Sequence, residues 1–577
     1  MAEYIVKNGF VVDPGTGVNT EKMDIAIKDG KIVETNEVRN PKIIDASGMI
    51  VMAGAVDVHS HSAGPKVNAG RNFRPEDKLN YYKAKKGVKR MEAGFSVPTA
   101  ISSGYIFARM GYGFVMEAAM PPLFAKHTHE EIRDTPIVDE AALPVFGNNW
   151  FVMEYLKNHE IENVASYIAW LLRVTKGYGI KCVNPGGTEA WGWGMNCVTP
   201  DDPVPYFDVT PKEIIRGLIE ANEYLRLPHS MHLHSNSLGE PGNYQITIDS
   251  LKCAEGIKAQ SDYGREQVLH HTHLQFHSYG GDSYSSKRFE SKSKEVMDYV
   301  NGTDNITFDI GQVTLDETTT MTADGPFEYH LSHMNNLKWV NKDVELETCA
   351  GIVPFIYNPN SFIAVAQWAI GQELALLTKD MTKCFITTDA PNAGPVHRYP
   401  RVIKWLMSSK AREKILDDCK YGDSVRSQCY IGEIDRELSF YEIALMSRLG
   451  AAKCLGLSHM FGSLKPGMEG DLAVYAYNPE TDDDPEKIEH AFGNAQYFIK
   501  SGELIINDGE IVSNGNKRTF WVKPEMELTA QVERDVTERF KKYYTVTQNN
   551  YEVKEDHYVP NPYVIEVDAA ESEEVKA

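Results

Sequence analysis

The chain has 577 residues, of which 42% are hydrophobic and 24% are charged. Its 59 basic residues are outnumbered by 81 acidic ones, and the resulting net charge of −22 argues against a nucleic-acid-binding protein. No run of about 18 uninterrupted apolar residues is present, and the N-terminus lacks the charged and apolar regions of a signal peptide. We therefore expect a cytoplasmic protein with a large buried core.

Short β-rich runs fill residues 4–44, with turns at Asp13-Pro14-Gly15 and at Asp29-Gly30. The same texture returns at residues 471–475, 497–506 and 508–512. We expect the two ends to pair into one β-sandwich, with the middle of the chain inserted between them. The predicted divisions are residues 1–50 and 461–522 for the β-sandwich, 51–460 for the inserted domain and 523–577 for a C-terminal extension.

The middle of the chain alternates short apolar strands with longer helical patterns, which is typical of an α/β protein built from βα units around a parallel sheet. Eight strands are expected, and eight suggest a (β/α)8 barrel, in which polar residues at the C-terminal ends of the strands form the active site. The strand candidates are residues 50–58, 96–101, 143–146, 179–183, 230–234, 267–274, 306–310 and 384–388.

One intervening helix has clear start signals. Thr210 is a predicted N-cap, Pro211 occupies the first helical position, and Glu213 completes a capping box. Apolar residues then recur on one face until Pro228, directly before the next strand.

Two segments are harder to place. Residues 105–122 are expected to be a long loop and helix with ordinary packing, and the alternative is a substrate channel or lid. Residues 525–544 form a charged helical pattern that leads into spaced tyrosines and an acidic end. This extension is too polar to form its own core, so we expect either a solvated tail or a segment that orders on neighbouring subunits.

Eight cysteines are scattered along the chain without any C-x-x-C pair, which argues against zinc ribbons, iron–sulfur clusters and a disulfide framework. Any bound metal must therefore use other ligands. The cysteines are Cys182, Cys197, Cys253, Cys349, Cys384, Cys419, Cys429 and Cys454.

The first strand of the inserted domain ends in His59-Ser60-His61. Side chains two apart on a strand point to the same face, so both imidazoles can reach one metal ion. Alone this pattern is weak, because paired histidines are often structural.

Further strand ends carry His or Asp: residues 231–234 contain His232 and His234, residues 270–273 contain three histidines, and the last strand ends in Asp389. Four such strand ends are difficult to obtain from scattered surface residues. For some of the histidines the preferred interpretation is a hydrogen-bonded structural role; these are His229, His232, His270, His271 and His277.

Lys181 lies within an apolar strand between glycine-rich turns. Such a lysine usually reaches solvent or pairs with a carboxylate. Facing a barrel interior, it would lose hydration and its pKa would fall. A neutral amine can add CO2 to form a carbamate, which is a two-oxygen anion able to bridge two metals.

The set His59, His61, Lys181, His234, His273 and Asp389, in this order on successive strands, resembles the amidohydrolase superfamily of hydantoinases and dihydroorotases. Residues 462–475 also resemble that superfamily's return into its flanking β-sandwich. Within it, residues 54–70, 179–187 and 232–239 are most similar to the formyl-transferring subunits of formylmethanofuran dehydrogenases. The similarity covers about residues 1–520.

The resemblance implies a binuclear zinc site. His59 and His61 would hold one metal, His234 and His273 the other, while N6-carboxylated Lys181 bridges both and Asp389 ligates and shuttles protons. The choices of His234 over His232, and of His273 over His271, stay open in the sequence.

The resemblance further implies formate and the amine of methanofuran as substrates in methanogenesis from CO2. The formate would come from a partner subunit with a tungsten or molybdenum pterin, supported by iron–sulfur subunits. The alternative is a stand-alone cyclic amidohydrolase of the hydantoinase or dihydroorotase type, which the same ligand set permits.

Overall fold

The computed structural model describes residues 2–334, 338–342 and 350–570. In this part of the chain none of the helices is both long and apolar enough to span a bilayer. The seven cysteines that it includes are free, and Cys349 lies outside the described residues.

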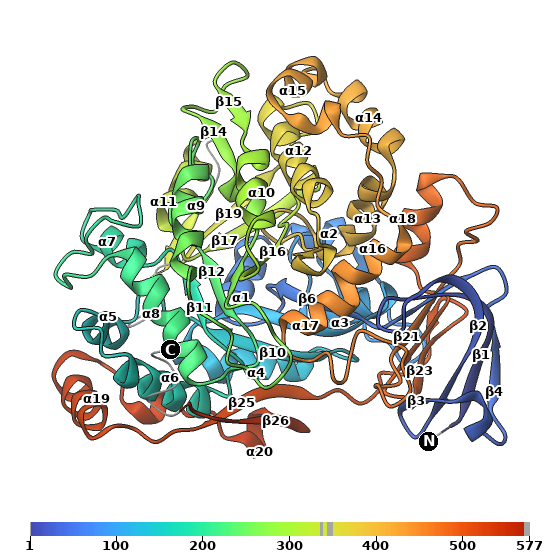
Figure 1. The fold of residues 1–577 in the computed structure, drawn as a ribbon, viewed down its shortest axis with the longest axis horizontal. Helices are drawn as coiled ribbons and strands as arrows, with labels where there is room; N and C mark the ends of the chain where they lie inside the picture. Colours follow the sequence, from blue (N-terminus) through green and yellow to red (C-terminus); the bar gives the residue numbers. More distant parts are fainter. Residues whose placement is uncertain (1, 335–337, 343–349, 571–577) are drawn as a thin grey trace.

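A ring of parallel strands lies at the centre of the molecule (Figure 1). Strand β9 pairs in parallel with β6 on one side and with β10 on the other. Strands β11, β12, β13, β16 and β20 pair in parallel with one another in that order. Val145 bridges to Lys181 between β10 and β11, and the backbone N–H of His61 donates to the Ala390 carbonyl at 2.7 Å, which closes the ring. The predicted (β/α)8 barrel is confirmed. Its strands are β6 (Ala55–Ser60), β9 (Tyr112–Met120), β10 (Asp139–Pro144), β11 (Lys181–Val183), β12 (Met231–His234), β13 (Leu269–His271), β16 (Ile306–Asp309) and β20 (Cys384–Phe385).

Seven of the eight predicted strands overlap strands of the ring, and the prediction for residues 96–101 is wrong. Thr99 caps a helix there, α3 (Ala100–Arg109). The missing strand is β9, inside the segment expected to be a loop and helix. Every residue of β9 is buried, so its sequence shows no alternation of apolar and polar residues. A short, fully buried strand cannot be distinguished from a buried helix by periodicity.

Helices alternate with these strands along the chain. The predicted capping box is confirmed in α8, where Thr210 Oγ1 accepts from the Glu213 backbone N–H at 3.3 Å and the Glu213 carboxylate accepts from the Thr210 N–H at 2.8 Å. The main helices are α1 (Pro65–Phe73), α4 (Ala125–Asp134), α5 (Trp150–Leu156), α6 (Ile161–Thr175), α7 (Gly187–Gly192), α8 (Pro211–Tyr224), α9 (Tyr244–Leu251), α10 (Ser293–Asn301), α12 (Phe362–Leu377), α13 (Tyr399–Met407), α14 (Ser409–Asp418), α15 (Gly422–Gln428), α16 (Phe440–Ala444), α17 (Gly450–Cys454) and α18 (Pro485–Gly493).

The two ends of the chain pair into one nine-stranded sheet beside the barrel, as expected (Figure 1). The junction is antiparallel, with Leu472 of β21 opposite Ala53 of β5. Ile27, Val51 and Val474 are fully buried in the core of this sheet. Its strands are β1 (Tyr4–Asp13), β2 (Val18–Lys28), β3 (Lys31–Val33), β4 (Lys42–Asp45), β5 (Ile50–Ala53), β21 (Leu472–Tyr475), β22 (Tyr497–Lys500), β23 (Glu503–Asn507) and β24 (Glu510–Ile511).

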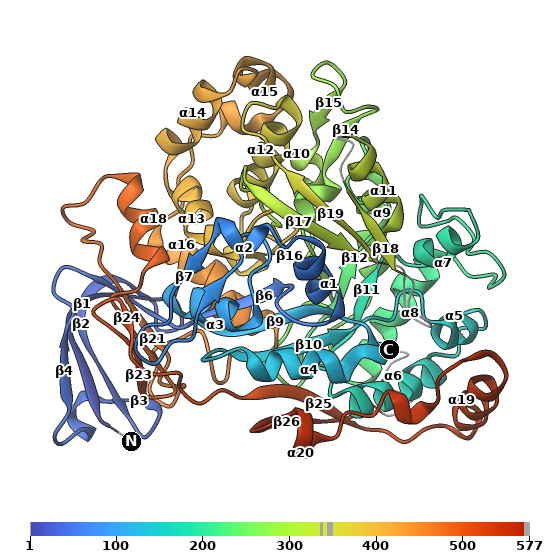
Figure 2. The same ribbon diagram turned by 180° about the vertical axis from the view of Figure 1, so that it is seen from behind.

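The C-terminal extension packs on its own barrel (Figure 2). Strand β25 (Thr519–Glu525) pairs with β10, and β26 (Pro562–Asp568) pairs with β25. The C-terminal part of the chain therefore adds two strands beside β10. Helix α19 (Ala530–Tyr543) packs against α6 and buries Val532, Val536 and Phe540. As far as residue 570, the extension is therefore not a solvated tail, because its few apolar residues join the core of the barrel.

A small insertion lies over the C-terminal ends of the barrel strands. It comprises β17 (Glu317–Thr322), α11 (Gly325–Met334), β18 (Val340–Lys342) and β19 (Ala350–Ile356). Ala323 packs with Ala119, Val145 and Val183, which lie at the ends of β9, β10 and β11. The insertion therefore roofs the region where the strand-end polar residues meet.

Candidate metal centre

The two histidines of the first barrel strand converge on one carboxylate. His59 Nε2 lies 2.9 Å from Asp389 Oδ1, and His61 Nε2 lies 3.3 Å from the same oxygen. Both rings are buried, and ligand atoms of the three side chains lie within 4.8 Å of one another. Parallel strands present their carboxyl ends at one rim, which explains why residues 330 apart in sequence meet here.

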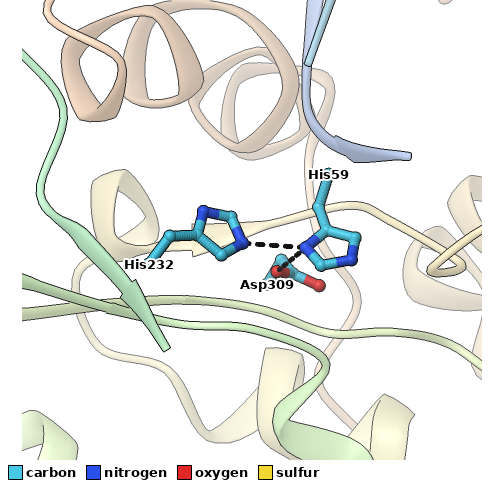
Figure 3. A group of neighbouring side chains, drawn as sticks. All are labelled: His59, His232 and Asp309. Atoms are coloured by element: carbon cyan, nitrogen blue, oxygen red, sulfur yellow. Dashed lines mark hydrogen bonds and ion pairs between the residues drawn. The ribbon is translucent and has the colours of Figure 1, made fainter. Parts of the chain in front are cut away.

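A second cluster lies deeper in the barrel and comprises His59, His232 and Asp309 (Figure 3). His232 Nε2 lies 2.8 Å from His59 Nδ1, and Asp309 Oδ2 lies 3.7 Å from that same nitrogen. The other ring nitrogen of His232 contacts His229 Nε2 at 2.9 Å, and His229 Nδ1 contacts the Cys454 carbonyl at 2.9 Å. His232 therefore has partners at both ring nitrogens.

His234 and His273 lie together on the opposite side of the centre. Their ring centroids are 4.7 Å apart, and both side chains are buried. Among the described residues, His234 Nε2 and His273 Nδ1 have no hydrogen-bond partner. His273 Nε2 lies 3.9 Å from Asp389 Oδ2, which brings this pair to the same aspartate as His59 and His61.

Local backbone conformation decides which histidine of 270–273 faces the centre. His273 has a left-handed conformation with φ of 36°, just beyond the end of β13. The left-handed conformation interrupts the alternation of side chains between the two faces of the strand. The His273 N–H donates to Asp309 Oδ1 at 3.0 Å. His271 instead contacts Ser235 Oγ at 3.0 Å and the Thr272 carbonyl at 3.1 Å.

Lys181 is buried within β11, and its Nζ has no hydrogen-bond partner in the described part of the chain. Burial lowers the pKa of this amine to about 7, although Asp389 and Asp309 oppose the shift. Near pH 7 a substantial fraction of the Lys181 amine is therefore uncharged, and the uncharged amine is the form that reacts with CO2. The sequence-based expectation of a low Lys181 pKa agrees with this environment.

The charge state of the other groups suits metal ligation. Burial lowers the pKa of His59, His232 and His273 well below the ordinary value, so these imidazoles are neutral. Burial alone would raise the pKa of Asp389, but His273 and His61 hold it below its ordinary value. Neutral imidazoles and ionised carboxylates are the forms that divalent metals bind.

Two acidic residues that contact the candidate metal ligands, Glu117 and Asp309, were not predicted from the sequence. Glu117 lies on β9; its Oε2 accepts from the N–H groups of Ser62 and Ala63 at 2.7 and 2.9 Å, and its Oε1 lies 3.2 Å from His61 Nδ1. Glu117 therefore orients the His61 ring through its Nδ1 atom, while His61 Nε2 faces Asp389. Asp309 ends β16 and accepts from Thr387 Oγ1 at 2.5 Å, and contacts with His59 and His270 lower its pKa to about 2 against the effect of burial. Each is the lone acid of a buried strand, which is the signal that could have identified it.

The donor set fits a divalent metal ion. Imidazole nitrogens and carboxylate oxygens converge from several strands. Three buried nitrogens have no hydrogen-bond partner among the described residues: Lys181 Nζ, His234 Nε2, which lies 3.6 Å from Asp324 Oδ2, and His273 Nδ1. A buried polar atom without a partner is costly, and binding of an ion removes that cost.

Comparison with known proteins agrees with this geometry. Residues 42–512 match the Amidohydrolase family. The chain is 53% identical over 572 residues to protein FwdA of Methanocaldococcus jannaschii, covering 99% of this chain and 100% of the relative. It is 33% identical over 542 residues to a subunit of the formyltransferase/hydrolase complex Fhc of Methylorubrum extorquens, covering 93% and 94% respectively. One chain in the crystal structure of that organism's FhcABCD complex with methylofuran superposes with a TM-score of 0.87 at 31% identity, covering 99% of this chain and all of that one.

Proposed function

The chain belongs to the amidohydrolase family, and from this premise we propose that it is the formyl-transferring subunit of a formylmethanofuran dehydrogenase. It condenses formate with the amine of methanofuran to give N-formylmethanofuran, and it catalyses the reverse hydrolysis. The observation that carries this proposal is the convergence of His59 and His61 on Asp389 beside the unpartnered amine of Lys181. Full-length similarity to the Fhc protein, whose complex was crystallised with methylofuran, supports the substrate class.

Two zinc ions are the proposed cofactors. His59 and His61 would hold one ion, His234 and His273 the other, and Lys181 would bridge them as N6-carboxylysine. The hydrogen-bond pattern supports these choices: His232 and His271 have contacts at both ring nitrogens, whereas His234 and His273 each keep one nitrogen without a hydrogen-bond partner among the described residues. When bound, the metals polarise the formate or formamide oxygen and lower the pKa of a bound water.

Asp389 is the proposed proton carrier. Its Oδ2 accepts from Asn392 Nδ2 at 2.9 Å, which fixes the carboxylate while Oδ1 faces His59 and His61. In synthesis Asp389 takes a proton from the attacking amine and delivers it to the departing formate oxygen, which leaves as water. In hydrolysis it protonates the departing amine.

The chain supplies no redox centre of its own in this proposal. Its cysteines form no cluster motif in the sequence. Reduction of CO2 to formate is therefore assigned to a partner subunit with a tungsten or molybdenum pterin and to iron–sulfur subunits. The Fhc relative is itself named as one part of a larger complex. The C-terminal extension, residues 523–577, is the proposed contact region.

The stand-alone cyclic amidohydrolase is not favoured, because the two full-length relatives do not carry the name of such an enzyme. A direct test uses the full chain loaded with zinc. It should deformylate N-formylmethanofuran, but it should not transfer electrons from formate to an artificial acceptor. Electron transfer by this chain alone would contradict the proposed division of labour, and the absence of deformylation at full metal occupancy would contradict the amidohydrolase chemistry.

A further inference from the structure

Glu328 on α11 is a buried carboxylate that lacks a hydrogen-bond partner among the described residues. It is 0% exposed, and neither Oε1 nor Oε2 has a hydrogen-bond partner among the described residues. A carboxylate in this state is much less favourable than a hydrated one. A cationic ligand bound beside it would supply the missing partner, so this carboxylate is a candidate for binding one.

The position of Glu328 connects it to the metal centre. Helix α11 packs on β17 and β19 in the insertion that roofs the barrel mouth. The insertion is also joined to the Asp389 loop, because the Met321 N–H of β17 donates to Asn392 Oδ1 at 2.7 Å and Asn392 Nδ2 donates to Asp389 Oδ2 at 2.9 Å. The charge of Asp389 raises the pKa of Glu328. Tyr357, which follows β19, is also buried within electrostatic range of both acids, and its hydroxyl has no hydrogen-bond partner in the described residues.

The proposed reaction needs a second proton acceptor. An ammonium ion and formate give a formamide and water, so two protons leave the nitrogen and both end on the departing oxygen. A single carboxylate carries one proton at a time. Asp389 serves the step in which the carbon–nitrogen bond forms, and the ammonium must lose its first proton before its nitrogen can attack.

We propose that Glu328 binds the ammonium form of the amine substrate and accepts its first proton. This rests on the formyl-transfer function proposed above and assigns the amine end of the same site. The step is R-NH3+ plus the Glu328 carboxylate giving R-NH2 plus the Glu328 carboxylic acid. The neutral amine then attacks the formate carbon, Asp389 takes the second proton, and both protons are returned to the departing oxygen as water. In this proposal the Tyr357 hydroxyl accepts a hydrogen bond from the same ammonium group.

The surroundings of Glu328 suit this role. Burial, together with Asp324 and Asp389, raises the pKa of Glu328 well above its ordinary value, while Lys66 of α1 opposes the shift. The positive charge of a bound ammonium group favours the ionised form of Glu328, and a carboxylate with a raised pKa is a stronger base that is better matched to an ammonium donor. Asp324, Lys66 and Asp389 shift the pKa of Glu328, and Tyr357 lies within electrostatic range of it, so the pH dependence must be compared between variants.

The test compares Glu328→Gln with wild type in the zinc-loaded full chain, with formate in excess. We expect the rate of methanofuran formylation at pH 7 to fall about 10²-fold, the lower range for loss of a proton-transfer group. Formylation of hydroxylamine, which is mostly neutral at this pH, should remain close to wild type. The deficit with methanofuran should also shrink as pH rises and the free amine becomes neutral in solution.

Glu240→Gln is the matched control. Glu240 lies on the rim of the same region and pairs with His330 at 2.6 Å, so this variant removes an acid without touching the amine site. It should behave as wild type with both amines. Calorimetric titration with methanofuran alone should show weaker binding for Glu328→Gln and for Tyr357→Phe, and thermal unfolding and zinc content should be unchanged.

Equal loss with both amines, or unchanged methanofuran kinetics, would overturn the role of Glu328. These outcomes differ from a failure of the proposed function itself, in which the wild-type chain would formylate neither amine.

Discussion

Lys181 of β11 lies directly opposite His232 of β12 in the parallel ladder, and Val183 lies opposite His234 two residues further along. Because strand side chains alternate, Lys181 and His232 share one depth of the barrel, while His234 lies one layer nearer the mouth. The Lys181 amine has no hydrogen-bond partner among the described residues. It lies between the cluster of His59, His232 and Asp309 and the pair formed by His234 and His273.

Replacing Lys181 with Ala should leave at most one metal per chain. The carbamate would supply the negative charge that two neighbouring dications need, and alanine removes it. Metal content measured by mass spectrometry should fall by half or more, and small carboxylates such as acetate should restore part of it. Lys157→Ala, at an exposed position just after α5, serves as the control. Full occupancy in the Lys181 variant would contradict the bridging role.

Carboxylation of Lys181 should depend on pH with a defined sign. Burial lowers the pKa of this amine to about 7, so the reactive neutral form increases as pH rises through that value. Metal-free protein incubated with zinc and bicarbonate should regain activity faster at pH 8 than at pH 6. A rate that falls over this range would show that another group controls reconstitution.

Asp389→Asn should leave the fold intact and reduce both formamide hydrolysis and synthesis by a factor of about 10² to 10⁴, the range for loss of a general acid–base group. The amide keeps the shape of the side chain but cannot carry the proton. Circular dichroism and zinc content distinguish lost chemistry from lost ligation. Near-normal turnover would assign proton transfer to another residue, with His273 as the first candidate.

Substituting His234 and His232 separately should distinguish a ligand from a supporting residue. His234→Ala removes a buried nitrogen that has no hydrogen-bond partner among the described residues, so the zinc content should fall by about one ion per chain. His232→Ala breaks the contacts to His59 and His229, which should weaken metal affinity about 10- to 100-fold, as loss of an outer partner does. The reverse pattern would exchange the two roles.

Glu117→Gln tests the positioning of His61. Glu117 accepts two backbone N–H groups and faces His61 Nδ1, so the neutral amide should loosen that ring. We expect zinc affinity to fall about 10- to 100-fold with little change in the free energy of unfolding of the zinc-loaded protein. Competition with a chelator measures the first quantity and denaturant unfolding the second. Unchanged zinc affinity would indicate that His61 is fixed by other contacts.

The sequence by itself predicted the barrel, apart from strand β9, and the pairing of the two ends of the chain into one sheet. It also supplied the candidate metal ligands, whose roles stay a prediction. Strand ends such as residues 56–61 and 384–389 combine an apolar run with His or Asp, and that pattern is local. The capping box of α8 is equally local, since its hydrogen bonds join residues three apart.

Only the tertiary structure decided which polar groups meet. Strand β9 is buried on both faces, so its sequence carried no period and Glu117 remained hidden within it. His271 and His273 differ by a left-handed turn that depends on the Asp309 carboxylate of a neighbouring strand. The lack of a partner among the described residues, as for Lys181 Nζ and the Glu328 carboxylate, is a property of everything packed around a group. No local pattern encodes it, because it depends on side chains brought together from distant parts of the chain.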